Sequence, residues 1–131
     1  MNPTTPSDKS GFKAVLLVDD DRQLVDSLRA AMMDENFLVD VASDGEEAFL
    51  KAKVHQYDAI VCDLMMPKLR GDAFYRQATE LRPEFAERFL FITGYGNDPE
   101  ISRFLSTVPA RCLLKPFTIQ ELIDSVRRLV A

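Results

Sequence analysis

The sequence predicts an α/β domain in which helices cover both faces of a five-stranded parallel sheet. Three observations favour this fold class. Short apolar segments alternate five times with segments of helical period, four of the apolar segments are almost continuously hydrophobic, and no linker interrupts the pattern after residue 11. Such alternation predicts right-handed crossovers between parallel strands. Nearly uninterrupted apolar strands are typical of a sheet that is buried on both faces.

The expected strands are short runs of apolar residues. They are KAVLLV at 13–18, FLVDV at 37–41, AIVC at 59–62, FLFI at 89–92 and RCLL at 111–114. The second run alternates apolar and polar residues, which suits an edge of the sheet, whereas the other four suit burial on both faces.

Helices are expected between the strands, where apolar residues recur three and four positions apart. The clearest stripes are Leu24, Leu28, Ala31 and Met32; Ile101, Phe104, Leu105 and Val108; and Leu122, Val126 and Leu129. The segments 43–46 and 118–121 both match a capping box, which marks the start of a helix. Pro83 marks the end of the third helix.

The composition limits the classes of function. A chain of 131 residues suits one domain, and its net charge of -5 argues against binding nucleic acid or an anionic membrane. Cys62 and Cys112 lack CxxC spacing, so we expect reduced thiols in a cytoplasmic protein rather than a zinc site. The apolar run 14–18 is too short to span a bilayer. Residues 1–11 are predicted to be a flexible tail, and residues 12–131 the domain.

Chemically active residues follow four of the five expected strands. Asp19 and Asp20 follow the first strand, Asp63 the third, Thr93 the fourth and Lys115 the fifth. Because the carboxyl ends of parallel strands meet at one edge, these side chains should gather in one crevice. Three close carboxylates favour a cation, and oxygen ligands without His or Cys suit Mg²⁺. An aspartate there could act as a nucleophile toward a phosphoryl group.

The order of these motifs resembles the receiver domain of two-component response regulators. The motifs are Asp19-Asp20, Asp63 in CDLMMPKLRG, Thr93 in FITGYG and Lys115 in LLKPF. The resemblance covers nearly the whole chain and implies a flavodoxin-like, doubly wound (βα)5 fold with strand order 2-1-3-4-5. It implies that Asp63 accepts a phosphoryl group from a histidine kinase or a histidine phosphotransfer protein. Lys115 would pair with that group, and Thr93 would turn inward to bond it.

The resemblance also implies a set of metal ligands. Asp20, Asp63 and the backbone carbonyl of Met65 would hold Mg²⁺, and Asp19 would ligate it through water. Asp21 lies outside this acidic pair, and we assign it to the start of the first helix, where the helix dipole favours a carboxylate.

The chain departs from the family pattern at three positions. Receivers usually carry an aromatic residue three positions before the lysine, where this chain has Cys112, which puts the aromatic-rotamer part of the family's switch in question. Met65 and Tyr95 stand where the family flanks the path of attacking water. Both side chains are bulky and uncharged, which predicts slow hydrolysis of the phosphoaspartate.

The expected function is therefore a phosphorylation-activated switch. The chain would promote only its own phosphorylation and dephosphorylation, and would not be an enzyme in the usual sense. Phosphorylation would change the surface formed by the fourth helix, fifth strand and fifth helix, which would control a downstream effector protein. The output would pass through contacts with another molecule, unless this receiver is a fragment of a hybrid kinase.

Two other functions are compatible with parts of the sequence. A haloacid-dehalogenase-like small-molecule phosphatase would use Asp19 as its nucleophile, in a DxD pattern that residues 19–21 match. The chain has no room for the cap domain of such a phosphatase, and Asp63 and LLKPF fit a receiver better. A pseudo-receiver would bind partners without phosphorylation, but all five chemical positions are present.

Overall fold

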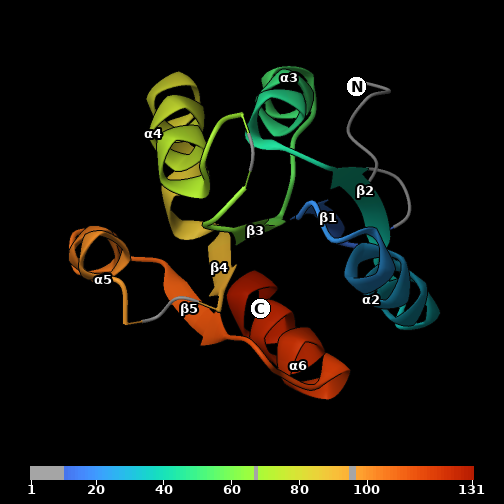
Figure 1. Ribbon diagram of the computed structural model, residues 1–131. Coiled ribbons are helices and arrows are strands. Elements are labelled where there is room, and N and C mark those ends of the chain that lie inside the picture. The colour runs from blue at the N-terminus through green and yellow to red at the C-terminus, as the bar shows by residue number, and fades with distance from the viewer. Residues whose placement is uncertain (1–10, 67, 95–96) are drawn as a thin grey trace.

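Five parallel strands form a single sheet in the order β2-β1-β3-β4-β5 (Figure 1). This confirms the expected doubly wound fold and its strand order. The computed structural model describes residues 11–66, 68–94 and 97–131, so most of the predicted tail lies outside the described residues. The strands are β1 (Ala14–Val18), β2 (Leu38–Ala42), β3 (Ala59–Asp63), β4 (Phe89–Thr93) and β5 (Arg111–Leu114).

Three strands, β2, β3 and β4, end one residue later than predicted, and the shifts of β3 and β4 affect the site. Asp63 is the last residue of β3 and Thr93 the last residue of β4, rather than the first residues after them. β5 also differs, because it is half-buried with Arg111 and Leu114 exposed. The prediction of burial on both faces was wrong for β5, since this strand forms the second edge of the sheet.

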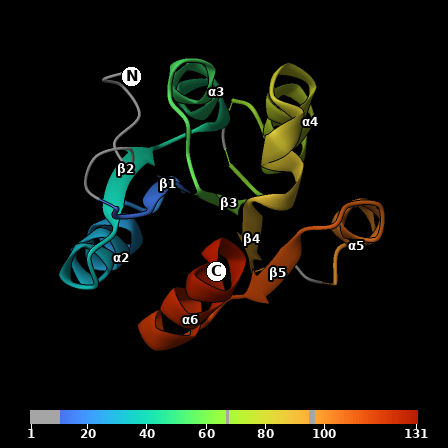
Figure 2. The same cartoon turned by 180° about the vertical axis from the view of Figure 1, so that it is seen from behind.

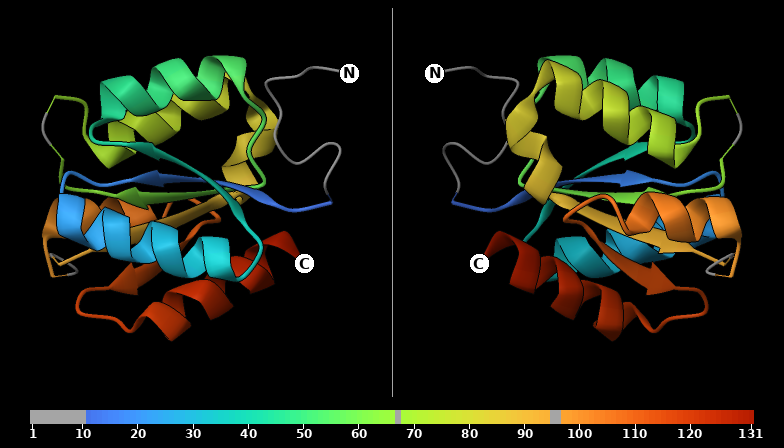
Figure 3. Two further views of the ribbon diagram at one scale, coloured as in Figure 1. Left: turned by 90° about the vertical axis from the view of Figure 1, so that its right-hand side faces the viewer. Right: turned by 90° about the vertical axis from the view of Figure 1, so that its left-hand side faces the viewer.

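Helices cover both faces of the sheet, as Figures 1 and 2 show from opposite sides. They are α2 (Arg22–Asp34), α3 (Gly45–Val54), α4 (Gly71–Leu81), α5 (Pro99–Leu105), α6 (Ile119–Val130) and the 3-10 helix η1 (Pro83–Glu87). The helices α2 and α6 pack on one face, and α3 and α4 lie side by side on the other (Figure 3). No helix in the described part of the chain combines the length and the apolar character needed to cross a membrane.

The sheet separates two apolar cores. Alternate residues of β1 belong to different cores, with Leu16 on the side of α3 and α4 and Leu17 on the side of α2 and α6. Phe104 places α5 in the first of these cores, together with Phe91 of β4. The in-register parallel pairing of β1, β3 and β4 brings the carboxyl ends of these central strands to one edge of the sheet.

The helix starts confirm one predicted capping box and correct the other. Thr118 and Glu121 form the expected box at the start of α6. At α3 the N-cap is Asp44, whose side chain accepts a 2.8 Å bond from the amide of Glu47. The carboxylate of Glu47 reaches back to Ser43. The predicted box at 43–46 was therefore one residue too early, because Ser and Asp are equally competent N-caps.

Candidate functional site

Three carboxylates meet at the carboxyl edge of the central strands. Asp19 directly follows β1, and Asp63 ends the neighbouring strand β3, where Val18 pairs with Cys62. One oxygen each of Asp19, Asp20 and Asp63 lies within 4.8 Å of the others. Asp19 and Asp63 are buried and Asp20 is exposed, so the cluster is open on one side.

Lys115 joins the two buried acids. Its Nζ lies 3.0 Å from Oδ2 of Asp19 and 3.4 Å from Oδ2 of Asp63. The other oxygen of each acid accepts a main-chain amide, from Asp21 at 3.0 Å and from Met65 at 3.2 Å. Lys115 is 96 positions from Asp19 in the sequence and 52 positions from Asp63. The convergence of β1, β3 and β5 thus brings residues that are distant in the chain into direct contact.

The electrostatics of the site leave it short of positive charge. Burial and the nearby charge of Asp19 raise the pKa of Asp63 to about 6, although the amide of Met65 and the ammonium of Lys115 partly oppose the rise. Burial lowers the pKa of Lys115, but its hydrogen bond to Asp19 and the charges of both acids outweigh burial and raise it overall. Three carboxylates facing one ammonium would be stabilised by a further cation.

The donor set suits a hard divalent cation. Carboxylate oxygens without imidazole or thiolate favour Mg²⁺ over zinc or copper. Cys62 precedes Asp63 but does not join the set, because its thiol is fully buried and donates to the carbonyl of Asp63. Burial also raises the pKa of this thiol well above its usual range, which keeps it protonated.

Thr93 and Met65 lie beside this cluster. Thr93 is fully buried at the end of β4, and its carbonyl accepts a 2.8 Å bond from the amide of Lys115. The peptide bond between Lys115 and Pro116 is cis. Met65 reaches Asp63 through its amide, and the proposed role of its carbonyl stays a prediction. The prediction for Tyr95 lies outside the described residues.

Two glycines support the site by allowing close approaches of backbone that no motif in the sequence indicates. A Cβ at Gly71, the first residue of α4, would overlap the carbonyl oxygen of Asp63 and lie 2.9 Å from Cα of Leu64. A Cβ at Gly45 would overlap the carbonyl oxygen of Leu69, in the loop that follows β3. The glycines themselves are visible in the sequence, but nothing local indicates which backbone approaches them.

Comparison with known proteins points to one family. The family model for the response regulator receiver domain matches residues 15–127. The response regulator ArlR of Staphylococcus aureus is 29% identical over 116 residues, which are 88% of this chain and 52% of ArlR. The chain therefore spans about half the length of the curated relatives that it matches.

Solved structures show the same fold. A CheY-like receiver domain protein from Methanospirillum hungatei has a TM-score of 0.82 and 25% identity, covering 91% of this chain and 94% of that one. Chemotaxis protein CheY4 of Vibrio cholerae has a TM-score of 0.80 and 28% identity, with 90% and 98% covered. TrrA of Thermotoga maritima, solved in complex with Mg(2+)-BeF, has a TM-score of 0.78 and 24% identity, with 90% and 99% covered.

Proposed function

This chain belongs to the response regulator receiver domain family, and from that membership we propose that Asp63 accepts a phosphoryl group from a phosphohistidine. Receiver domains are signalling switches of two-component systems rather than classical enzymes. The donor would be a histidine kinase or a histidine phosphotransfer protein, and residues 12–131 would form the receiver domain. The single observation that carries the proposal is the contact of Lys115 with both buried acids.

The contacts favour Asp63 over Asp19 as the nucleophile. Lys115 lies closer to Asp19 than to Asp63, at 3.0 Å against 3.4 Å, and the amide bond to Asp19 is also the shorter, at 3.0 Å against 3.2 Å. A carboxylate with weaker hydrogen bonds keeps more of its nucleophilicity. This argues against the haloacid-dehalogenase-like alternative, which would use Asp19.

In the proposed reaction, a carboxylate oxygen of Asp63 attacks phosphorus and displaces the imidazole nitrogen of the donor. The phosphorus–nitrogen bond breaks as the aspartyl phosphate forms. The ammonium of Lys115 would then pair with the phosphoryl oxygens, because its contact with Asp63 already holds it beside the acceptor carboxylate. The hydroxyl of Thr93 would donate to the same group. Both interactions are directed at the transferred group, which favours the charge that develops on it.

Receiver domains bind Mg²⁺ at this acidic pocket, and the three carboxylates fit that ion. Asp20, Asp63 and the carbonyl of Met65 would hold it. As the family resemblance implies, Asp19 would contribute through water, while its own oxygens accept hydrogen bonds from Lys115 and Asp21. When bound, the ion supplies positive charge that offsets the charge of the carboxylates and the phosphoryl oxygens.

The output would be a change of surface. Phosphorylation would alter the face made by α5, β5 and α6, on which Leu114 and Ile119 are exposed, and this change would control a downstream effector protein. Cys112, which is half-buried on β5, occupies the usual aromatic position. The proposal includes a cytoplasmic location and no direct contact with nucleic acid or membrane.

The test is intact-mass measurement after incubation with acetyl phosphate and Mg²⁺. The wild-type chain should gain the mass of one phosphoryl group, and Asp63→Asn should gain none. Asp26→Asn, which changes another acid near the site, serves as the matched control and should be labelled like the wild type. A label that persists in Asp63→Asn, or one that maps to Asp19 after borohydride reduction and peptide sequencing, would overturn the assignment.

A further inference from the structure

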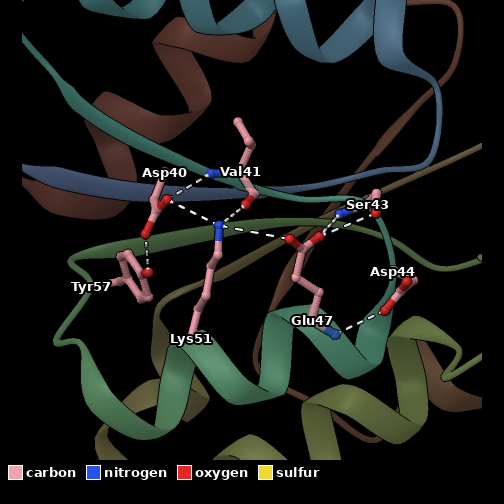
Figure 4. Close-up of polar contacts among 7 residues, drawn as sticks. All are labelled: Asp40, Val41, Ser43, Asp44, Glu47, Lys51 and Tyr57. Atoms are coloured by element: carbon pink, nitrogen blue, oxygen red, sulfur yellow. Dashed lines mark hydrogen bonds and ion pairs between the residues drawn. The ribbon is translucent and has the colours of Figure 1, made fainter.

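The charged residues of α3 fall into two groups. The side chains of one group form hydrogen bonds and ion pairs with other residues of the chain. Glu47 accepts hydrogen bonds from Ser43, and Nζ of Lys51 lies 3.3 Å from Oδ1 of Asp40 and donates to the carbonyl of Val41 (Figure 4). Asp40 also accepts a 2.7 Å bond from the hydroxyl of Tyr57. These contacts join the inner side of α3 to the edge strand β2.

The outward charges of α3 lack such partners. Glu46 and Lys53 are both exposed, and neither side chain forms an ion pair with any residue in the described ranges. Leu50 lies between them and is 62% exposed. Positions 46, 50 and 53 are four and three residues apart, so their side chains form one stripe along the helix.

Apolar side chains extend this stripe into a face. Val54 is 54% exposed and Leu81, at the end of the neighbouring helix α4, is 50% exposed. With Leu50 they make up three of the seven large hydrophobic side chains exposed in the described part of the chain. A groove of about 400 Å³ adjoins Leu50 and is lined by Glu46, Phe49, Leu50, Leu69 and Gln77. We call this set of residues on α3 and α4 the α3 face.

We propose that the α3 face binds the same face of a second copy of this chain, with the two α3 helices antiparallel about a two-fold axis near Leu50. A two-fold interface places one surface against itself, so that surface must be self-complementary. Glu46 and Lys53 are seven residues apart, about 10 Å or two helical turns. Antiparallel pairing therefore sets Glu46 of each copy opposite Lys53 of the other, with the two Leu50 side chains between the charge pairs.

Charge complementarity also distinguishes this occupant from others. A purely acidic or basic partner would be attracted by one end of the stripe and repelled by the other. The stripe carries one charge of each sign at its two ends and a leucine at its centre, which matches its own antiparallel copy. Lys53 already lies over the ring of Phe49, with its Nζ 5.7 Å from the ring centre, so its ammonium is held on this face.

The test is sedimentation equilibrium of the full chain from low micromolar to millimolar concentration. The wild type should form a concentration-dependent dimer, and Leu50→Glu should be monomeric throughout. Met33→Glu is the matched control, because Met33 is 52% exposed on α2, away from this face, and its variant should dimerise like the wild type. A wild-type chain that stays monomeric overturns the proposal and leaves the α3 face to a different protein.

Charge exchange gives a sharper test of the antiparallel arrangement. Glu46→Lys and Lys53→Glu should each weaken dimerisation about tenfold or more, because each places like charges opposite one another. The double variant should recover nearly wild-type dimerisation, since both pairs are restored with exchanged signs. Each charge reversal is also unfavourable for the dipole of α3. If the single variants dimerised weakly only because α3 was destabilised, the two destabilising effects would add in the double variant and it would not recover. A double variant that dimerises more weakly than either single variant overturns the proposal.

Discussion

Asp19 and Asp63 are held close together although both are buried, and this repulsion has a cost in stability. The pKa of Asp63 rises from 3.8 to about 6, first through burial and then through the charge of Asp19. The folded chain therefore holds a proton more tightly than the unfolded chain. Without a metal ion, stability should fall as the pH rises from about 4 to about 6 and stay reduced above that range.

We predict that Asp63→Asn stabilises the metal-free protein at neutral pH by about 2 kcal/mol, because it removes the buried charge and keeps the shape of the side chain. Lys115 keeps its closer partner, Asp19, in this variant. Urea unfolding in the presence of a chelator, repeated across the pH range, measures the effect. The two proteins should converge in stability near pH 4, and equal stability at pH 7 would contradict the prediction.

The site residues differ in how far the sequence could reveal them. Asp19, Asp63 and Lys115 could be predicted to meet because each lies at the end of an apolar strand and parallel strands end on one edge. The individual hydrogen bonds could not be predicted, because they depend on side-chain rotamers. The close approach of Gly71 to Asp63 was missed for a different reason: a missing side chain does not specify which distant backbone fills the space.

Helix α4 begins directly against the strand that carries the proposed acceptor. A methyl group at Gly71 would meet backbone atoms of Asp63 and Leu64, which cannot move aside as a flexible side chain could. We predict that Gly71→Ala destabilises the chain by about 2 kcal/mol and slows phosphorylation by acetyl phosphate, because the start of α4 must shift. Unfolding curves and labelling time courses measure the two effects.

Gly94→Ala provides the matched control for stability, since a Cβ there would lie more than 4 Å from every described residue other than its chain neighbours. That variant should unfold within about 0.5 kcal/mol of the wild type. If Gly71→Ala were equally neutral, the close packing of α4 on Asp63 would have no energetic importance.

The end of α3 is tied to the end of α4 by a single side chain. Arg82 donates to the carbonyls of Ala52 at 3.1 Å and Lys53 at 2.9 Å, and to the side chain of Gln56 at 2.7 Å. A cation at a helix C-terminus also interacts favourably with the helix dipole. We predict that Arg82→Ala lowers the free energy of unfolding by about 2 kcal/mol.

Arg82→Lys should recover only part of this stability, because an ammonium cannot reach three acceptors with the planar geometry of a guanidinium. Arg29→Ala, at an exposed position on α2, is the control and should be close to neutral. Chemical denaturation of the three variants measures these changes in the free energy of unfolding. Full stability in Arg82→Ala would exclude the proposed role of this side chain.

The boundaries of the elements were predictable where the hydrophobic pattern determines them. They were less predictable where neighbouring side chains compete for the same hydrogen bond. The strands were placed within one residue because their apolar runs are short and bounded by polar residues. The cap of α3 was misplaced because Ser43 and Asp44 are adjacent and both can cap a helix. The burial of β5 was overestimated, since an apolar sequence alone cannot tell an edge strand from a central one.

The whole molecule places its chemistry on one edge of a sheet whose two faces are both buried. This arrangement followed from the alternation of strands and helices, whereas the strand order rested on the family resemblance. The α3 face could not have been predicted from the sequence. Exposure of Leu50 depends on how α3 packs against α4 and β2, and the apolar pattern of α3 alone would allow Leu50 to be buried.

Magnesium should stabilise the molecule as a whole, because its proposed ligands come from the ends of β1 and β3, which separate on unfolding. Binding to the folded chain alone adds about 2.7 kcal/mol at a concentration one hundred times the dissociation constant. We predict that Mg²⁺ raises the melting temperature of the wild type and has little effect on Asp20→Asn. Asp20 is exposed, so its replacement should leave the metal-free stability nearly unchanged and isolate the loss of a ligand. Thermal melts with increasing Mg²⁺ measure this, and an equal rise in both proteins would place the ion elsewhere.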